Sequence, residues 1–375
     1  MKVVKVRSPF IIEVNEAGAI GSKIELFIYS YGSSVPATPT YTLSKLNPSA
    51  TQLNTAYNVS NFVKEYIDNI KATYVPFYGE LEQNNEWVKF QVKRYKLVGT
   101  TYTLLNTTDY IGVNGFTDYT SGNQEPSEVK VLLLSNPNIN NYYYKQTSYP
   151  NTLTQYFNLL VDKPTTTTTT INVKYERIDG VIYEYTNNLS VGGAGIFNFA
   201  QPITPVKEIG FYGNFVNGCK VTITYTPAAG APIVLPSFYT YPIEECKYTP
   251  VLCDFVNRYG GWQTITFFKS NLQNIETTSK DFNLLPSSVN YNVFKGQKRT
   301  FNQQGKQKIK CNTGWVDENY FELIQDLLLS EVVLLDNKPV IVKSQSLERK
   351  THLKDKNINY EIEFEYNYGL INDVI

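Results

Sequence analysis

The side chains that most often perform chemistry are few and scattered in this sequence. Its one histidine, His352, lies in a basic polar stretch at residues 350–354 and is expected at the surface. A Ser-His-Asp triad requires a histidine, and a structural zinc site requires several histidines or paired cysteines, yet no C-x-x-C pair is present. Enzyme chemistry would therefore depend on carboxylates, and an all-oxygen cation site stays open.

Neither the carboxylates nor the glycines form a recognisable site. Glu244 and Glu245 are adjacent, and adjacent side chains on an extended segment point to opposite faces, unlike the facing pair of a glycosidase. Residues 317–319 lack the spaced ligands and central glycine of a calcium loop. Residues 192–195, Gly-Gly-Ala-Gly, lack the rest of a phosphate-binding motif and predict a flexible turn. The sequence thus predicts no catalytic, cofactor-binding or metal-binding residue, and a protein that is not an enzyme.

The cysteines do not suggest a disulfide framework. Cys219, Cys246, Cys253 and Cys311 are widely and irregularly spaced in a long chain. We expect all four to be reduced, with Cys246 and Cys253 as the one pair close enough in sequence to be an exception.

Charge and length limit the functional classes further. The 375 residues include 34 Lys and Arg and 34 Asp and Glu, so the formal net charge is zero. The chain therefore lacks the surplus of positive charge that phosphate binding requires. No run approaches the ~20 apolar residues of a membrane span, and no signal peptide follows the first residues. We expect no membrane insertion and two or three domains, because single cores rarely exceed ~250 to 300 residues.

The elements that would position these side chains are mainly strands. The chain has 30 Tyr and 20 Phe but one Met, which favours sheets. Apolar and polar residues alternate at 23–29, 87–95, 220–225 and 360–366, as in antiparallel sheets with one face on a core. Helical periodicity appears only at about 60–71 and 317–329, with Ser60 and Asp317 as candidate N-caps. The predicted fold is mainly β, with two to three antiparallel sandwich-like or barrel-like domains and two short packed helices.

Turn-rich passages suggest the domain boundaries. We predict an N-terminal β domain at 1–122 with the first helix, a middle β domain at 123–250, and a C-terminal β domain at 251–375 with the second helix. In the middle domain, the threonine run 165–170 is expected to be an exposed edge strand or a linker. Gly260 and Gly261 are predicted to join two antiparallel strands, 252–259 and 262–269.

Residues 227–250 form a proline-rich segment with a large apolar content. Its five prolines exclude it from a sheet interior, which predicts either an extended arm docked on a neighbouring copy or a loop folded back on its own domain. The aromatic clusters at 142–144 and at Tyr239 with Tyr241 are expected to belong to an interface or a core, with a sugar-stacking platform as the alternative. The candidate interface residues are Pro232, Leu235, Phe238, Tyr239, Tyr241, Tyr142, Tyr143 and Tyr144.

Three parts of the chain resemble virion structural proteins of tailed phages that infect Bacteroidetes. They are residues 8–12 with 26–29 and 57–67, residues 255–268 with their N-x-x-G-G-aromatic pattern, and residues 315–335 with 339–342 and 360–366. Residues from roughly 75 to 245 carry no such resemblance. The most similar setting is a crAss-like podovirus.

The resemblance implies a β-rich ring protein of the tail barrel beneath the portal. The expected partners are further copies of the chain in a cyclic homo-oligomer and other tail or portal-proximal proteins. Phage DNA would pass through the ring without specific binding, and assembly would take place in the host cytoplasm before the protein resides in the virion. The alternative is a carbohydrate-binding adhesin or a tail-fibre-like receptor-binding protein, although the long repeats of a fibre are absent. A polysaccharide-cleaving enzyme with paired carboxylates is the third hypothesis.

Overall fold

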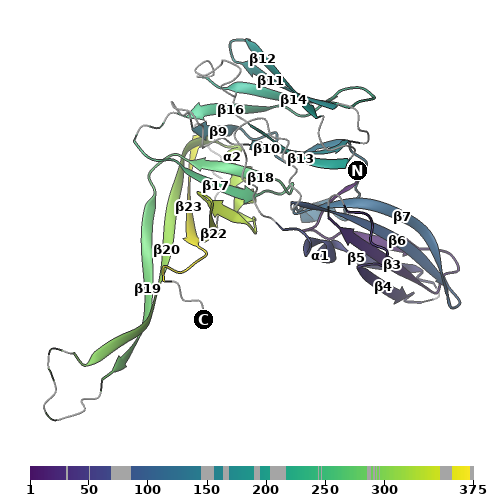
Figure 1. The fold of residues 1–375 in the computed structure, drawn as a ribbon, viewed down its shortest axis with the longest axis horizontal. Helices are drawn as coiled ribbons and strands as arrows, with labels where there is room; N and C mark the ends of the chain where they lie inside the picture. Colours follow the sequence, from purple (N-terminus) through teal and green to yellow (C-terminus); the bar gives the residue numbers. More distant parts are fainter. Residues whose placement is uncertain are drawn as a thin grey trace.

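The computed structural model consists mainly of antiparallel sheets arranged in three regions along the chain (Figure 1). Within the described part of the chain, no helix is long and apolar enough to cross a membrane. The structure describes residues 1–30, 33–49, 51–68, 86–144, 156–163, 169–189, 195–202, 217–243, 245, 247–284, 289, 292, 294, 296–346 and 357–371. His352, Cys246, Glu244 and most of the predicted turn at 192–195 and threonine run at 165–170 lie outside these residues.

The N-terminal region packs a two-stranded sheet and a short helix on a five-stranded sheet. The large sheet has the order β1-β7-β6-β3-β4, and β2 pairs with β5. Apolar side chains that alternate along both sheets, such as Ile12, Ile24 and Phe90, form one core. The elements are β1 (Val3–Lys5), β2 (Ile11–Asn15), β3 (Gly21–Tyr29), β4 (Tyr41–Leu46), β5 (Asn54–Asn58), α1 (Ser60–Lys64), β6 (Trp87–Val98) and β7 (Thr101–Val113).

The middle region contains two sheets that share a core. One has the order β13-β10-β8 and the other β12-β11-β14-β16-β9, with the short β15 on β14. Leu159 and Val161 of the smaller sheet pack with Val173 and Ile223 of the larger one. The strands are β8 (Val131–Leu133), β9 (Asn141–Tyr144), β10 (Tyr156–Lys163), β11 (Thr169–Arg177), β12 (Ile182–Leu189), β13 (Gly195–Pro202), β14 (Cys219–Thr226), β15 (Ile233–Val234) and β16 (Phe238–Ile243).

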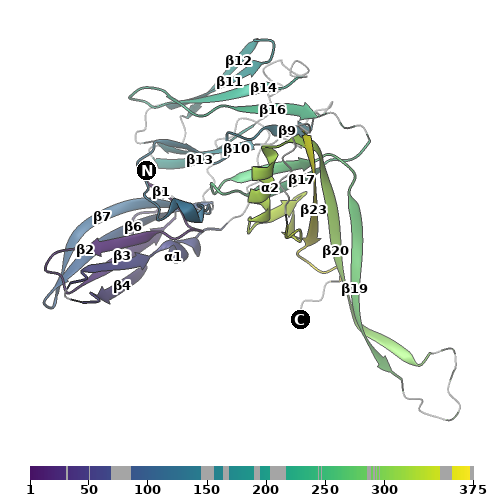
Figure 2. The same cartoon turned by 180° about the vertical axis from the view of Figure 1, so that it is seen from behind.

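The C-terminal region is a seven-stranded sheet of order β18-β17-β21-β22-β23-β20-β19 with one helix on its apolar face. The helix α2 contributes Leu323, Ile324 and Leu327 to the core. The outer parts of β19 and β20 leave the body of the molecule, as both views show (Figure 2). The elements are β17 (Val251–Val256), β18 (Trp262–Phe267), β19 (Leu272–Asn283), β20 (Lys298–Asp317), α2 (Tyr320–Leu328), β21 (Val333–Leu335), β22 (Lys338–Val342) and β23 (Asn357–Tyr366).

Both predicted helices exist and are shorter than predicted; the first begins at Ser60, as predicted, whereas the second begins at Tyr320 instead of Asp317. The first ends at Lys64, and the residue before it, Val59, makes no side-chain cap bond. Ser60 is the first residue of the helix and not its N-cap, and its hydroxyl donates to the Asn58 Oδ1 atom over 2.8 Å. Asp317 does not cap the second helix, because it ends β20 and its carboxylate accepts bonds from the middle region.

The proline-rich segment is not an extended arm, so that prediction is wrong. Its residues form β15 and β16, and β16 lies between β14 and β9 inside the larger middle sheet. The prolines are tolerated because most of them lie between strands. The exception, Pro242, pairs only with β9, whereas the β14 pairing of this strand ends at Thr240. A missing N–H on the open side of a strand breaks no ladder bond.

The predicted hairpin at Gly260 and Gly261 is confirmed, with one correction. β17 and β18 pair antiparallel, and Val256 lies opposite Trp262. The positive φ belongs to Gly260, at 85°. Gly261 is required for a different reason, since a Cβ atom there would lie 2.6 Å from both the Cβ and the carbonyl oxygen of Leu134.

This turn is where the three regions meet. A Cβ on Gly115 of the N-terminal region would lie 2.5 Å from the Arg258 carbonyl oxygen, so the two backbones are in direct contact. The buried Asn257 amide donates to the Leu134 carbonyl of the middle region over 2.9 Å. Its Oδ1 atom accepts from the backbone of Gly261 within its own turn. One side chain therefore satisfies backbone groups of two regions at once.

A charge pair fixes the helix α2 to the same turn. The Arg258 Nε atom donates to the Asp326 Oδ1 atom over 2.6 Å, and the Asp326 side chain is 1% exposed. Burial raises the pKa of the Asp326 carboxyl above its ordinary value, while Arg258 acts in the opposite direction by favouring the charged form. The Arg258 guanidinium also lies over the Phe116 ring of the N-terminal region.

We predict that Gly261→Val lowers the free energy of unfolding by about 3 kcal/mol, because the side chain would be forced into the backbone of Leu134. Gly99→Ala is the control, since its Cβ would meet no atom within 4 Å and only the positive φ of 58° is strained. That control should cost about 1 to 2 kcal/mol. Urea denaturation measures both, and equal losses for the two variants would contradict the close approach.

We predict that Arg258→Met costs about 3 to 5 kcal/mol at neutral pH, since it leaves the Asp326 carboxylate buried without its cation. A carboxyl with a raised folded-state pKa binds its proton more tightly in the native state, so its contribution makes stability rise as pH falls through that pKa. The deficit should therefore shrink between about pH 7 and about pH 5. Lys280→Met, at an exposed lysine, is the matched control and should have little effect; a constant deficit at both pH values would refute the assignment.

Candidate interaction surfaces

The residues predicted to form an interface do not share one surface. Pro232 and Tyr239 are exposed, and Tyr142 and Tyr241 are half-buried. Leu235, Phe238 and Tyr143 are buried in their own subunit, so their prediction as intermolecular contacts is wrong. Alternation along β16 places Phe238 and Thr240 in the core and Tyr239 outside it. Tyr144 is the last residue of β9.

Four tyrosines form a continuous stack between the middle and C-terminal regions. Tyr239 stacks on Tyr241 with ring centroids 6.4 Å apart, and Tyr241 stacks on Tyr142 at 5.7 Å. Tyr142 meets Tyr320 of α2 edge-on at 5.6 Å, and its hydroxyl donates to the Asp317 Oδ2 atom over 2.9 Å. Burial and the Asp317 charge raise the pKa of Tyr142. These aromatic residues therefore join two parts of one subunit.

The described cysteines and acidic residues show little potential for chemistry. Burial raises the pKa of Cys219 to about 11 and that of Cys311 to about 12, so neither is a reactive thiolate near neutral pH. Cys253 is also completely buried. Glu245 pairs with Lys269 over 2.8 Å. Among the residues that the structure describes, no group of three His, Cys, Asp or Glu side chains could hold a metal ion.

The most prominent exposed feature is the β19–β20 ribbon, which consists of β19 and the part of β20 from Lys298 to Lys310. All 12 residues of β19 are exposed, and β19 is an edge of the seven-stranded sheet. In the outer part, Phe282 and Phe301 pack edge-on at 5.6 Å and each remains 44% exposed. An isolated two-stranded ribbon is marginally stable in water, so its outer part is suited to a partner.

The inner part of the ribbon is held by a ladder of opposite charges. Lys306, Lys308 and Lys310 on β20 pair with Glu365, Glu363 and Glu361 on β23, and Lys308 also pairs with Glu276 on β19. These side chains occupy the outer face of the sheet, opposite the face covered by α2. The outer part carries the exposed residues Lys280, Asp281, Lys298 and Arg299, an excess of positive charge.

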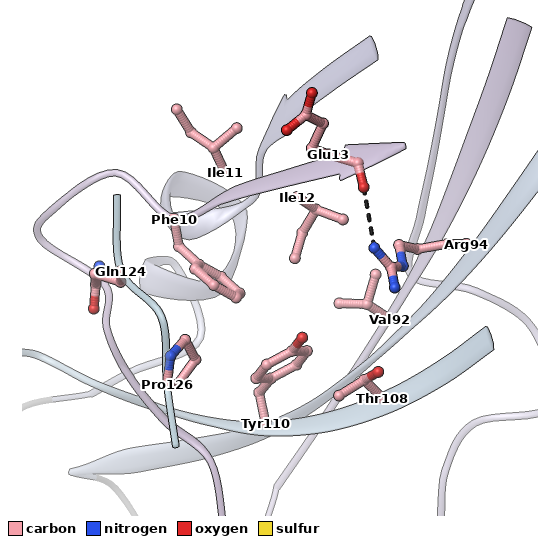
Figure 3. A pocket seen from close by; sticks show the side chains of 10 residues that line it. All are labelled: Phe10, Ile11, Ile12, Glu13, Val92, Arg94, Thr108, Tyr110, Gln124 and Pro126. Carbon is pink, nitrogen blue, oxygen red and sulfur yellow. Dashed lines mark hydrogen bonds between the residues drawn. The ribbon is translucent and has the colours of Figure 1, made fainter. Parts of the chain in front are cut away.

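A second feature is a groove along β2 in the N-terminal region (Figure 3). Its central pocket, about 230 Å³, lies between β2 on one side and β6 and β7 on the other. Two neighbouring hollows extend it toward Glu125 at one end and Glu16 at the other. The lining residues of the central pocket are Phe10, Ile11, Ile12, Glu13, Val92, Arg94, Thr108, Tyr110, Gln124 and Pro126.

Side chains occupy the backbone groups of β2 that face this groove. The Asn123 Oδ1 atom accepts from the Ile11 backbone N–H over 2.9 Å, and the Asn123 Nδ2 atom donates to the Ile11 carbonyl over 3.1 Å. The Arg94 Nη1 atom donates to the Glu13 carbonyl over 3.0 Å, as Figure 3 shows. An amide side chain that makes both bonds imitates the backbone of a neighbouring strand.

Neither surface was identified by the sequence reasoning. The groove could not be predicted from the sequence, because Glu13, Arg94 and Asn123 are far apart in the chain. The ribbon carries a signal that could have been read: residues 272–283 contain no proline and are rich in Thr, Asn and Gln, between two predicted C-terminal strands.

Comparison with known proteins adds no assignment: no protein-family model matches the chain, and a search of curated proteins finds no match either.

We predict that Cys219 and Cys311 do not react with an aromatic disulfide reagent in the folded protein near pH 8, because both thiols are buried and protonated. Both should react promptly after unfolding in urea. Mass spectrometry of peptides identifies each labelled position. Rapid labelling of either thiol before unfolding would contradict its burial.

Proposed function

We propose that this chain is a non-enzymatic structural subunit of a phage virion, an oligomeric ring component of the tail barrel near the portal. The feature that carries the proposal is the β19–β20 ribbon. It exposes a strand edge and two phenylalanines far from the core of its own subunit. Strand edges of this kind are usually covered or shortened in monomeric proteins, because they pair readily with other chains.

The composition and the resemblance support the same proposal. Charged residues make up 18% of the chain, whereas Tyr, which is enriched at interface cores, occurs 30 times. The resemblance to phage virion proteins includes the turn after Asn257 and the strands of the C-terminal region. Ring subunits need rigid β domains held in fixed relation, and backbone contact at Gly115 and Gly261 supplies such rigidity. Other tail or portal-proximal proteins would contact the ring faces, and DNA would pass through it.

The carbohydrate-binding alternative has less support from the aromatic residues. A sugar-binding platform presents the flat face of an aromatic ring to solvent. Tyr241 instead packs between Tyr142 and Tyr239, and Tyr142 packs on Tyr241 and Tyr320. Tyr142 and Tyr241, two of the rings that suggested a platform, therefore pack on other tyrosines of the same subunit.

We predict that the purified protein forms closed rings of many subunits. Mass photometry gives the mass of the assembly, and negative-stain electron microscopy shows whether it is closed. A protein that stays monomeric at all concentrations reached in both measurements would refute self-assembly into a ring.

A shortened-ribbon variant serves as the control for folding. Thr278 and Gln304 lie directly opposite each other, so residues 279–303 can be replaced by Asn-Gly, the preferred two-residue hairpin turn. We expect this variant to fold with the parent's circular dichroism but to remain monomeric.

A further inference from the structure

We propose that the subunits join by strand addition: the outer edge of β19 in one copy pairs with the free edge of β2 in the next. The proposal rests on the proposed function, because it names the contact through which the ring would form. Added strands gain affinity from main-chain hydrogen bonds, and neighbouring side chains give specificity.

The acceptor is the edge of β2 that faces the groove. The Val59 N–H donates to the Phe10 carbonyl, so alternate residues of β2 bond to β5 while Ile11 and Glu13 direct their N–H and C=O groups outward. Side chains of Asn123 and Arg94 now occupy three of these four groups. Side-chain partners can leave without disrupting a sheet, and they would be replaced by the backbone of an incoming strand.

The donor is the edge of β19 that faces away from β20. In the outer ribbon, the Leu284 N–H donates to the Gln297 carbonyl, which makes Phe282 and Arg299 the next hydrogen-bonded pair. The N–H groups of Asp281 and Asn283 therefore point outward. With 12 residues at about 3.4 Å each, β19 is roughly 40 Å long, far longer than the five-residue acceptor.

Charge favours this pairing over pairing between two identical edges. Glu13, Glu16 and Glu125 stand along the groove against Arg94 and Lys5, which leaves a small excess of negative charge. The outer ribbon presents Lys280, Lys298 and Arg299 against the single carboxylate of Asp281. Two ribbons would bring like charges together, whereas a ribbon in the groove brings opposite charges together.

The arrangement of the chain makes the contact intermolecular. The N-terminal region and the outer ribbon lie at opposite sides of the molecule in both views, so the ribbon does not reach its own β2 (Figures 1 and 2). A donor and an acceptor at different places on one subunit form a head-to-tail contact. Such contacts produce rings when the rotation between subunits closes.

The test uses one proline in each edge. Asp281→Pro removes an outward N–H of the donor, and Glu13→Pro removes an outward N–H of the acceptor; proline is tolerated where the N–H of an edge strand is unpaired. Each variant alone should be monomeric by mass photometry. Mixed in equal amounts, they should form dimers and nothing larger, because each pair retains one intact ribbon and one intact groove.

The controls are Asp281→Thr and Glu13→Thr, which remove the same charges but keep the N–H, and both should still assemble. Asn123→Ala should shift assembly to lower protein concentration, since it frees both Ile11 groups. If a proline variant fails to fold by circular dichroism, charge exchange replaces it: Glu13→Lys with Glu125→Lys, or Lys298→Glu with Arg299→Glu, should each weaken assembly, and all four in one chain should restore it.

The outcomes separate the two proposals. A parent protein that never assembles would overturn the ring function together with this contact. A parent that assembles while both proline variants also assemble, or whose proline variants stay monomeric when mixed, would overturn the strand-addition contact alone. In the charge-exchange experiment, failure of the fourfold variant to assemble would likewise overturn it.

Discussion

The close approach of three backbones at the turn from Asn257 to Gly261 is the constraint on which the rest of the structure depends. Gly115 meets the Arg258 carbonyl, and Gly261 meets Leu134, at distances that no Cβ atom permits. Since backbone is far stiffer than side chain, these contacts fix the three regions more firmly than side-chain packing alone would. The relative positions of the groove on the N-terminal region and the ribbon on the C-terminal region follow from this one turn.

Buried polar side chains also connect the three regions at this turn, and their hydrogen bonds restrict how the regions can be arranged. Asn257 binds the Leu134 carbonyl, and Arg258 pairs with Asp326 while lying over Phe116. Buried polar groups add little net stability when satisfied, but they are costly when left without partners. A displaced domain would leave several of them unsatisfied, which disfavours alternative arrangements of the regions.

The sequence predicted those parts of the fold in which one face of a strand is buried. Alternation located β3, β6, β14 and β23, and paired glycines located the β17–β18 turn. The prediction that prolines exclude residues 227–250 from a sheet was wrong, because the number of prolines does not show which side of a strand is unpaired. The strand β19 gave no alternation because both of its faces are in solvent. The groove assembles residues that only the folded chain brings together. Of the predicted interface tyrosines, Tyr142, Tyr239 and Tyr241 are in contact with one another within one subunit.

The length of β20 has a mechanical consequence. This single strand of 20 residues runs from the outer ribbon to Asp317, which accepts bonds from Asn140 and Tyr142 of the middle region. A pull along the outer ribbon therefore loads the β19–β20 and β20–β23 ladders in shear, so that many hydrogen bonds and the Lys–Glu rungs bear the force together instead of opening one by one. At the inner end of β20, the force passes through Asp317 to Tyr142 and the tyrosine stack. The ribbon is therefore a tether that is anchored in two domains.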